Sequence, residues 1–238
     1  MATAGNQLIE LLPRQDRRRL LAVCEPVELR LSDVLNERDS PTRHVYFPTQ
    51  GFISLVVATE GSPGLEVGMV GREGMLGAQL TLGVVTAPLR AVVQGPGTSW
   101  RIAVVEFRRE LARGIALQRA LQRYVYVLMM QLTRSAACLR FHQIGQRLAR
   151  WLLMSQDRSD SDRFLITHEF LAYMLGVRRV GITTAAVALQ RNGLIEYHRG
   201  ELTVLNRKGL EAAACACYRA DRQAYATVVI GNKRRAST

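Results

Sequence analysis

The sequence predicts an α+β fold in which an antiparallel β-sheet precedes a group of helices, and three observations support this. The hydrophobic period changes from two residues to between three and four near residue 107. Clusters of Gly, Pro, Ser and Asp separate short β-branched or aromatic runs before that point. Near the C-terminal end, two helical segments meet at a glycine and are followed by two alternating runs. A chain of 238 residues has room for one or two domains.

The N-terminal part predicts a short helix followed by a β-roll or barrel. Leucines fall near helical spacing over residues 7–24, with Pro13 as an interruption. Period-two runs follow between Pro26 and about Phe107, at residues 27–31, 44–47, 53–57, 65–70, 90–94 and 99–104. Turn-forming clusters separate them at residues 32–33, 40–41, 61–64 and 95–97. Short strands with regular turn signals are typical of an antiparallel roll.

The central part predicts a long helix with one apolar stripe. The stripe consists of Leu117, Leu121, Tyr124, Leu128 and Leu132, and no charge lies between Tyr124 and Leu132. Such a helix packs under the roll or against a second copy of itself as a dimer seam, and the stripe alone favours core packing. A second helix is expected from Phe141 to Trp151, and the polar stretch 156–162 is expected to be a surface loop.

Residues 163–211 predict a winged helix-turn-helix. Thr167 suits the N-cap of a helix that ends at Gly176, and a second helix should run from about Arg178 to Arg191. Small alanines on that second helix permit a close crossing of the first. Two alternating runs, 194–198 and 201–205, surround Arg199-Gly200 and predict a β-hairpin, the wing.

These elements divide the chain into four expected units. They are a β-roll domain with a short N-terminal helix (1–114), a central helix (115–140), a winged helix-turn-helix domain (141–212), and a C-terminal helix with a basic tail (213–238). No apolar run approaches the roughly 18 residues of a membrane helix. The N-terminus carries no secretory pattern, so a cytoplasmic protein without membrane contact is expected.

The charge distribution points to a polyanionic partner. The net charge is +12, and residues 139–238 carry 16 basic and 8 acidic groups, against 16 and 12 in residues 1–138. Such an excess favours nucleic acid first and a membrane surface second, although an arginine-rich proteome is the simpler explanation. The tail Lys233–Arg235 is expected to add nonspecific attraction for phosphate.

The cysteines and histidines predict neither a metal site nor an enzyme. The four cysteines, Cys24, Cys138, Cys215 and Cys217, match no zinc spacing, and Cys215 and Cys217 should diverge on a C-terminal helix. They are therefore interpreted as small buried residues, with redox sensing as the alternative. No nucleophile–base arrangement, paired carboxylates, Walker loop or His-Glu-x-x-His motif is present, so we expect no catalytic residues.

The chain as a whole resembles the Crp/Fnr family of bacterial transcription regulators. The resemblance rests on residues 165–184 and 192–195, which follow the family's Thr-x-x-x-Leu-Ala-x-x-Leu-Gly core without gaps, and on Tyr46-Phe-Pro48 followed by Gly51. It implies a cyclic-nucleotide-binding-like β-roll, a central dimerisation helix and a winged helix-turn-helix. It also implies a homodimer on palindromic double-stranded DNA, with RNA polymerase as a further partner.

The resemblance also assigns roles to residues of the second helix and the wing. Arg179 occupies the family's arginine position and is expected to read a guanine edge, while Val180 replaces the family's glutamate and Thr184 its later arginine. The operator should therefore differ from that of the catabolite activator protein. Thr183 and Thr184 are the other expected base readers, and the residues expected to contact phosphate are Thr167, Arg178, His198 and Arg199. The alternative for each arginine is a solvated surface charge, and for Thr167 a helix cap.

The sensor part departs from the family's cyclic-nucleotide site. Ala78 falls where the family has its ribose-binding glutamate, Leu89 where it has its phosphate-binding arginine, and Arg90 at the following Ser/Thr position. We therefore expect no cyclic AMP binding of the usual kind, because a buried phosphate needs a cation. Arg72, Glu73 and Arg90 remain weak candidates for another effector, with Arg72 and Glu73 as a plain surface pair the simpler interpretation. The effector is unknown, and no cofactor is evident.

Two functional hypotheses follow. The first is a sequence-specific DNA-binding transcription regulator. The alternative is a β-roll ligand-binding regulatory subunit whose winged helix mediates protein interaction; the twin arginines Arg178 and Arg179 argue against it.

Overall fold

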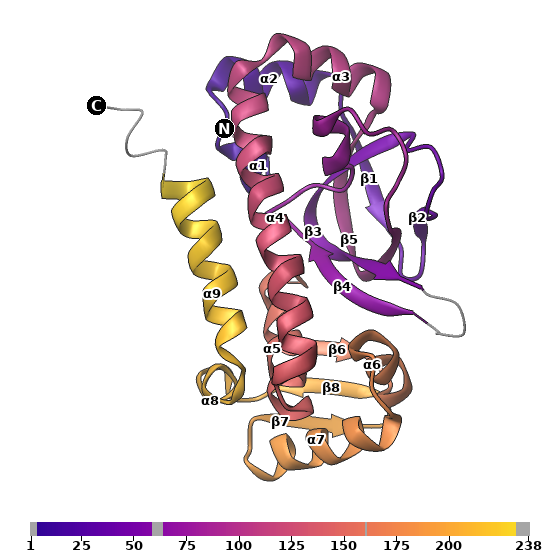
Figure 1. The fold of residues 1–238 in the computed structure, drawn as a ribbon, viewed down its shortest axis with the longest axis vertical. Coiled ribbons are helices and arrows are strands. Elements are labelled where there is room, and N and C mark those ends of the chain that lie inside the picture. The colour runs from indigo at the N-terminus through magenta and orange to yellow at the C-terminus, as the bar shows by residue number, and fades with distance from the viewer. Residues whose placement is uncertain (1–3, 59–63, 160, 232–238) are drawn as a thin grey trace.

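A computed structural model describes residues 4–58, 64–159 and 161–231. The expected turn at 61–64 therefore falls mostly, and the basic tail Lys233–Arg235 wholly, outside the described residues. The order of the parts agrees with the sequence: antiparallel strands, a long helix, then a compact helical domain with a small sheet (Figure 1).

The N-terminal sheet is an antiparallel roll of five strands. They are β1 (Glu25–Leu29), β2 (Val34–Asn36), β3 (His44–Val57), β4 (Leu65–Val70) and β5 (Arg90–Ala103). Their order is β1-β5-β3-β4, with β2 also paired to β5. A 3-10 turn, η1 (Ala78–Leu82), follows β4. Four of the predicted short runs are wrong as separate strands, because they merge in pairs into β3 and β5.

Glycines let β3 and β5 bend instead of breaking. The β3–β5 register shifts between Pro48 and Ile53. Gly51 lies there with a φ of +76°, and a Cβ on it would stand 2.3 Å from the carbonyl oxygen of Gly95. Only glycine fits such a close backbone approach, and the turn signal at residues 95–97 marks a bulge within a long strand.

Four helices surround the roll, and the longest crosses its open side. They are α1 (Gln7–Glu10), α2 (Arg14–Ala22), α3 (Val104–Arg113) and α4 (Ile115–Phe141). The interruption expected at Pro13 is confirmed, since Pro13 is the N-cap of α2. Leu117, Leu121 and Tyr124 are buried in a core shared with the strands and α1. The first half of the predicted apolar stripe therefore serves this chain's own core.

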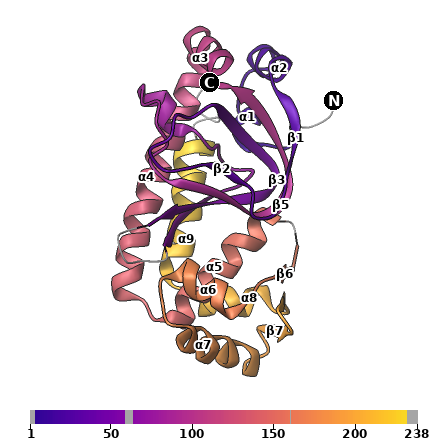
Figure 2. The same ribbon diagram turned by 90° about the vertical axis from the view of Figure 1, so that its right-hand side faces the viewer.

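The C-terminal part, except its last helix, lies below the roll (Figure 2). It comprises α5 (Ile144–Ser159), β6 (Arg163–Leu165), α6 (His168–Leu175), α7 (Arg179–Arg191), β7 (Ile195–His198), β8 (Glu201–Val204), α8 (Arg207–Ala213), α9 (Ala216–Tyr225) and the π-turn η2 (Ala226–Ile230). The small sheet has the order β6-β8-β7. α9 turns back along α4 (Figure 1).

Two predictions for this part are wrong. The expected loop at 156–162 is helical up to Ser159, because Asp157 receives hydrogen bonds from Arg207 and Tyr218. The expected single C-terminal helix is two, α8 and α9, separated at Ala214, where the backbone is extended. Among the described residues no single helix meets the length and hydropathy of a membrane span, although the bent pair α6 and α7 does so on length and composition alone.

Candidate nucleic-acid interface and sensor cavity

The α6–α7 pair has the geometry of a helix-turn-helix. Thr167 caps α6 by accepting a hydrogen bond from the Phe170 backbone N–H at 3.1 Å, as predicted. Gly176 ends α6 in the left-handed conformation with a φ of +60°, also as predicted. The two helices then meet at 110°. Ile182, Ala185, Ala186 and Leu189 are buried, and this face of α7 packs against the domain core.

The opposite face of α7 is exposed and carries the predicted base-reading residues. Arg179, Thr183 and Thr184 are all exposed, and Val180 is 76% exposed. Arg178 is the N-cap rather than the first helical residue. Within the part of the chain that the structure describes, neither Arg178 nor Arg179 forms an ion pair with a carboxylate. Both guanidinium groups are therefore available to an anion.

The two threonines of this face differ in how firmly they are held. The Thr184 hydroxyl donates only to the Val180 carbonyl one turn earlier, at 3.0 Å. The Thr183 hydroxyl bonds to the Arg179 carbonyl at 3.2 Å and also lies 3.0 Å from Nδ1 of His168. Thr183 therefore joins α6 to α7 in addition to facing outward.

His168 is a contributor to this surface that the sequence analysis missed. Its ring stacks on Tyr197 of β7, with centroids 4.3 Å apart, and so connects α6, α7 and the wing. Burial, followed by the positive charge of Arg179, lowers the pKa of His168. The motif gave no signal for it, because this position of the family pattern accepts any residue.

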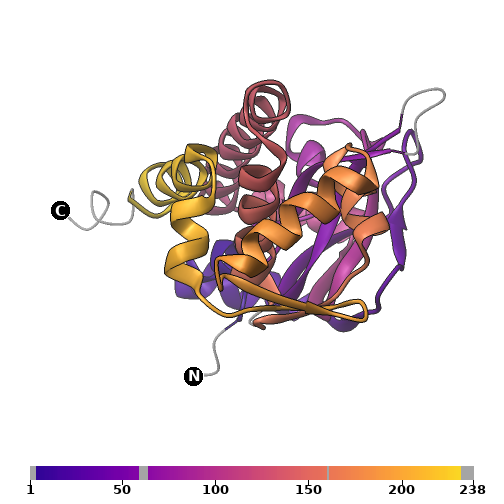
Figure 3. The same ribbon diagram turned by 90° about the horizontal axis from the view of Figure 1, so that it is seen from below.

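The wing is a tight two-residue hairpin. His198 pairs with Glu201, and between them Arg199 and Gly200 have φ values of +49° and +86°. Two consecutive positive φ values are typical of a type I′ turn, which matches the twist of the strands. His198 and Arg199 are exposed. α7 and the β7–β8 hairpin lie on the same end face of the molecule (Figure 3).

A second feature is an apolar cavity between the roll and α4, with a volume of about 220 Å³. None of the described residues that line it is ionisable; they include Leu55, Val70, Met75, Leu76, Ala78, Leu89, Val125, Leu128 and Leu132. Ala78 and Leu89, the predicted counterparts of the family's glutamate and arginine, both lie in this lining. The cavity therefore provides apolar contact but no charged partner for a phosphate or a ribose.

The weak effector candidates lie elsewhere. Arg90 forms an exposed ion pair with Glu37, with an N–O distance of 3.2 Å. Arg72 and Glu73 line a separate cavity of about 320 Å³ beside α5 and α9. The interpretation of Arg72 and Glu73 as a surface pair is wrong in one respect, because the carboxylate of Glu73 binds Arg158 of α5 at 2.6 Å.

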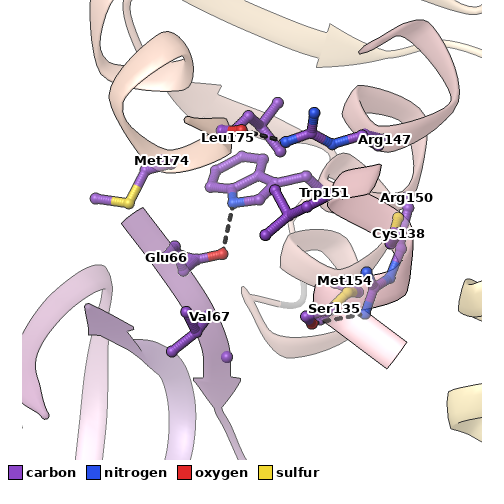
Figure 4. A pocket seen from close by; sticks show the side chains of 12 residues that line it. Glu66, Val67, Ser135, Cys138, Arg147, Arg150, Trp151, Met154, Met174 and Leu175 are labelled. Carbon is purple, nitrogen blue, oxygen red and sulfur yellow. Dashed lines mark hydrogen bonds between the residues drawn. The ribbon is translucent and has the colours of Figure 1, made fainter. Parts of the chain in front are cut away.

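The roll and the helix-turn-helix meet at a joint between β4 and α5 (Figure 4). The Trp151 indole N–H donates to Glu66 at 2.9 Å, and Ser54 donates to the other carboxylate oxygen at 2.5 Å. Arg147 of α5 donates to the carbonyl of Leu175 at the end of α6. Burial raises the pKa of Glu66 to about 7, against these two hydrogen bonds and the charges of Arg158 and Arg150.

The reasoning that separated the C-terminal cysteines is wrong. Cys215 does not lie on a helix with Cys217 but precedes α9 as its N-cap, with an extended backbone. Its side chain can therefore turn back toward Cys217. Cys138 and His142 at the end of α4 complete a group of four whose potential ligand atoms all lie within 4.8 Å of one another.

Comparisons with known proteins agree with this architecture. Residues 146–213 match the Crp-like helix-turn-helix domain. No curated protein matches the sequence.

The whole fold is similar to several solved structures, one of them of a transcriptional regulator. A regulator of the Crp/Fnr family from Eubacterium rectale superposes with a TM-score of 0.68 at 14% identity, covering 89% of this chain and 99% of that one. FixK2 from Bradyrhizobium japonicum gives 0.63 at 14% identity, covering 82% and 98%. CLP from Xanthomonas campestris, a global regulator responsive to c-di-GMP, gives 0.61 at 16% identity, covering 81% and 99%.

Proposed function

Since this chain carries a Crp-like helix-turn-helix domain on the fold of the Crp/Fnr transcription regulators, we propose that it regulates transcription by binding DNA sequence-specifically. The observation that carries the proposal is the exposed face of α7, where Arg178 and Arg179 have no carboxylate partner among the described residues. An α-helix of this kind fits the major groove. The protein acts as a DNA-binding module and not as an enzyme.

Contacts to bases come from α7. Arg179 projects from its first turn and donates two hydrogen bonds to the O6 and N7 atoms of a guanine. Thr183 and Thr184, one turn further along, contact neighbouring bases. The exposed methyl groups of Val180 favour a thymine methyl where other family members place a carboxylate.

Contacts to the phosphate backbone orient the domain. Arg178 lies at the N-terminus of α7, and Thr167 lies at the N-terminus of α6, where backbone N–H groups attract anions. His198 and Arg199 reach the adjacent backbone from the wing. None of these four residues reads sequence.

The protein binds DNA as a homodimer through α4. Besides the buried stripe, α4 carries an exposed one that recurs every three or four residues and consists of Tyr126, Met129, Thr133, Ala136 and Arg140. Tyr126 is 48% and Met129 57% exposed, which suits packing against a second copy. Two-fold symmetry then presents two α7 helices to a palindromic operator, with half-sites about 34 Å apart.

The sensor domain does not bind cyclic AMP in the usual way. A cyclic phosphate in the apolar cavity would lose its hydration without gaining a cation, which is unfavourable. Arg72, Glu73 and Arg90 do not line that cavity, so a ligand recognised by them binds outside it. The effector, RNA polymerase as a partner, a cytoplasmic location and the domain boundaries at residues 114, 140 and 212 stay predictions.

The test is a selection of bound fragments from random DNA, followed by footprinting on the selected sequence. We expect a palindromic consensus with protection of both half-sites, and a dimer mass by light scattering. Recovery of no consensus would instead support the regulatory-subunit hypothesis. Calorimetry with cyclic AMP and cyclic GMP tests the sensor, and micromolar binding would contradict the proposal.

A further inference from the structure

Three thiols and one imidazole converge where the sensor part joins the DNA-binding part. The Sγ atoms of Cys138 and Cys215 are 3.5 Å apart, and Cys217 Sγ lies 3.6 Å from Nδ1 of His142. The three cysteines are buried and form a cluster of their own, while His142 is half-buried. No function discussed above uses any of these four side chains.

The Cys138–Cys215 and Cys217–His142 distances are close to two edges of a zinc coordination tetrahedron, and the other distances among the four ligand atoms do not exceed 4.8 Å. With Zn–S bonds of about 2.3 Å and Zn–N bonds of about 2.0 Å, tetrahedral geometry places two sulfurs about 3.8 Å apart and a sulfur and a nitrogen about 3.5 Å apart. A disulfide would need its sulfurs about 2.0 Å apart. An iron–sulfur cluster would hold its ligand atoms farther apart, because irons and sulfides lie between them.

The local fold explains why the four ligands meet. Cys138 and His142 are four residues apart at the end of α4, so both lie on one side of its last turn. The extended backbone of Ala214 and Cys215 separates α8 from α9 and brings Cys215 beside α4. Cys217 follows in the first turn of α9. A pair of ligands from each of two chain segments is the arrangement of structural zinc sites.

The surroundings suit a site rich in thiolates. Three thiolates around Zn²⁺ leave a net charge of −1, which a neighbouring cation offsets. Arg150 of α5 is buried beside Cys138, where Asp221 of α9 holds it through a 2.8 Å ion pair.

We propose that Cys138, His142, Cys215 and Cys217 bind one zinc ion, which fastens α9 to the junction between α4 and α5. That junction is only two residues long, His142 and Gln143, and connects the central helix to the DNA-binding part. Its first residue is itself a ligand. The bound ion therefore limits how far α5 and the helix-turn-helix can swing relative to α4.

The primary experiment measures metal in the full-length protein. The chain is expressed in zinc-supplemented medium, purified without a histidine tag under reducing conditions, and analysed by mass spectrometry for metals and for intact mass. We expect about one zinc per chain after dialysis. In protein stripped of metal, cobalt(II) should produce the visible absorption of a tetrahedral thiolate site, and zinc should displace it.

Variants locate the ion. Cys138→Ser, Cys215→Ser and His142→Ala should each reduce retained zinc at least tenfold in a competition titration against a chromophoric chelator. Cys24→Ser is the matched control, because Cys24 lies apart from the cluster, and its zinc content should remain that of the wild type. Cobalt titration of stripped wild-type protein does not depend on any variant folding.

Several outcomes would overturn the proposal. They are a wild-type chain that neither retains zinc nor gives a cobalt spectrum, an intact mass two hydrogens lower from a Cys138–Cys215 disulfide, or iron and sulfide in place of zinc. Equal loss of zinc in Cys24→Ser would also contradict it. Because none of these measurements involves DNA, the zinc proposal and the regulator proposal can fail separately.

Discussion

The α7 face and the cavity between the roll and α4 differ in the charge that they offer a ligand. The α7 face has exposed arginines without carboxylate partners among the described residues and a hydroxyl-bearing second turn, which suits a polyanion. The cavity between the roll and α4 has a mainly apolar lining that includes Ala78 and Leu89, the predicted counterparts of the family's two charged ligands. The two regions therefore favour different ligands, an anion at the α7 face and an apolar group in the cavity.

The largest effect is expected from placing a charge in the cavity. Ala78→Glu buries a carboxylate among apolar side chains, and Ala78 itself is only 7% exposed. We expect the free energy of unfolding to fall by about 2–4 kcal/mol in urea denaturation, because the cavity has no cation to pair with it. Val84→Glu, at a position 47% exposed, is the control and should change it by less than about 0.5 kcal/mol. Equal unfolding free energies of the two variants would mean that water enters the cavity and solvates the carboxylate.

The second prediction concerns the α7 face. Arg179→Ala should weaken binding to the selected operator by about 1–3 kcal/mol and relax base preference at one position in each half-site. Arg108→Ala in α3 removes the same charge from an exposed site outside this face and should leave affinity unchanged. Binding would be measured by fluorescence anisotropy on the operator and on single-base variants. A uniform loss over all sequences would assign Arg179 to phosphate.

The sequence analysis predicted the ends of α6 and the buried side of α7 correctly because local signals determine them. Thr167 and Gly176 mark the two ends of α6, and the alanines of α7 show which side turns inward. The sequence analysis did not identify His168, because its partners Thr183 and Tyr197 lie 15 and 29 positions away along the chain. Its role depends on how α6, α7 and the wing pack together.

The other features that the sequence analysis missed depend on contacts between residues far apart along the chain. The pairing of Glu73 with Arg158 joins residues 85 positions apart, and Cys138 meets Cys215 across 77. No local period encodes such contacts. The same holds for β5, where the turn expected at residues 95–97 lies within one long strand once β5 pairs with β3.

A third prediction tests the joint between the two regions. Because burial raises the pKa of Glu66 to about 7 from its ordinary value of 4.5, the folded protein binds this proton more tightly than the unfolded chain does. Glu66 therefore lowers stability progressively as pH rises through that interval, and the effect is complete above pH 7. Glu66→Gln should therefore lose about 2 kcal/mol less unfolding free energy than the wild type over this pH interval. This value is reduced to allow for the half-buried position of the side chain.

The measurement for this joint is a series of urea denaturations between pH 4.5 and 8. Glu196→Gln removes an exposed carboxylate on β7 and should leave the pH dependence of the wild type unchanged. If the wild type and Glu66→Gln lost stability in parallel, the hydrogen bonds from Ser54 and Trp151 would outweigh burial and Glu66 would be ionised throughout.

The smallest effect is expected at the wing. A substitution there distinguishes a residue that contacts phosphate from one that contacts bases. Arg199→Asn removes the charge while keeping a residue that tolerates the left-handed conformation, so the type I′ turn should persist. We expect operator and random DNA to be weakened by the same factor, and the slope of log affinity against log salt to become shallower by about 1. Arg199→Ala loses the same charge but strains the turn, so any additional loss of unfolding free energy in that variant measures the turn alone. A change in base preference for Arg199→Asn would extend the reading surface from α7 to the wing.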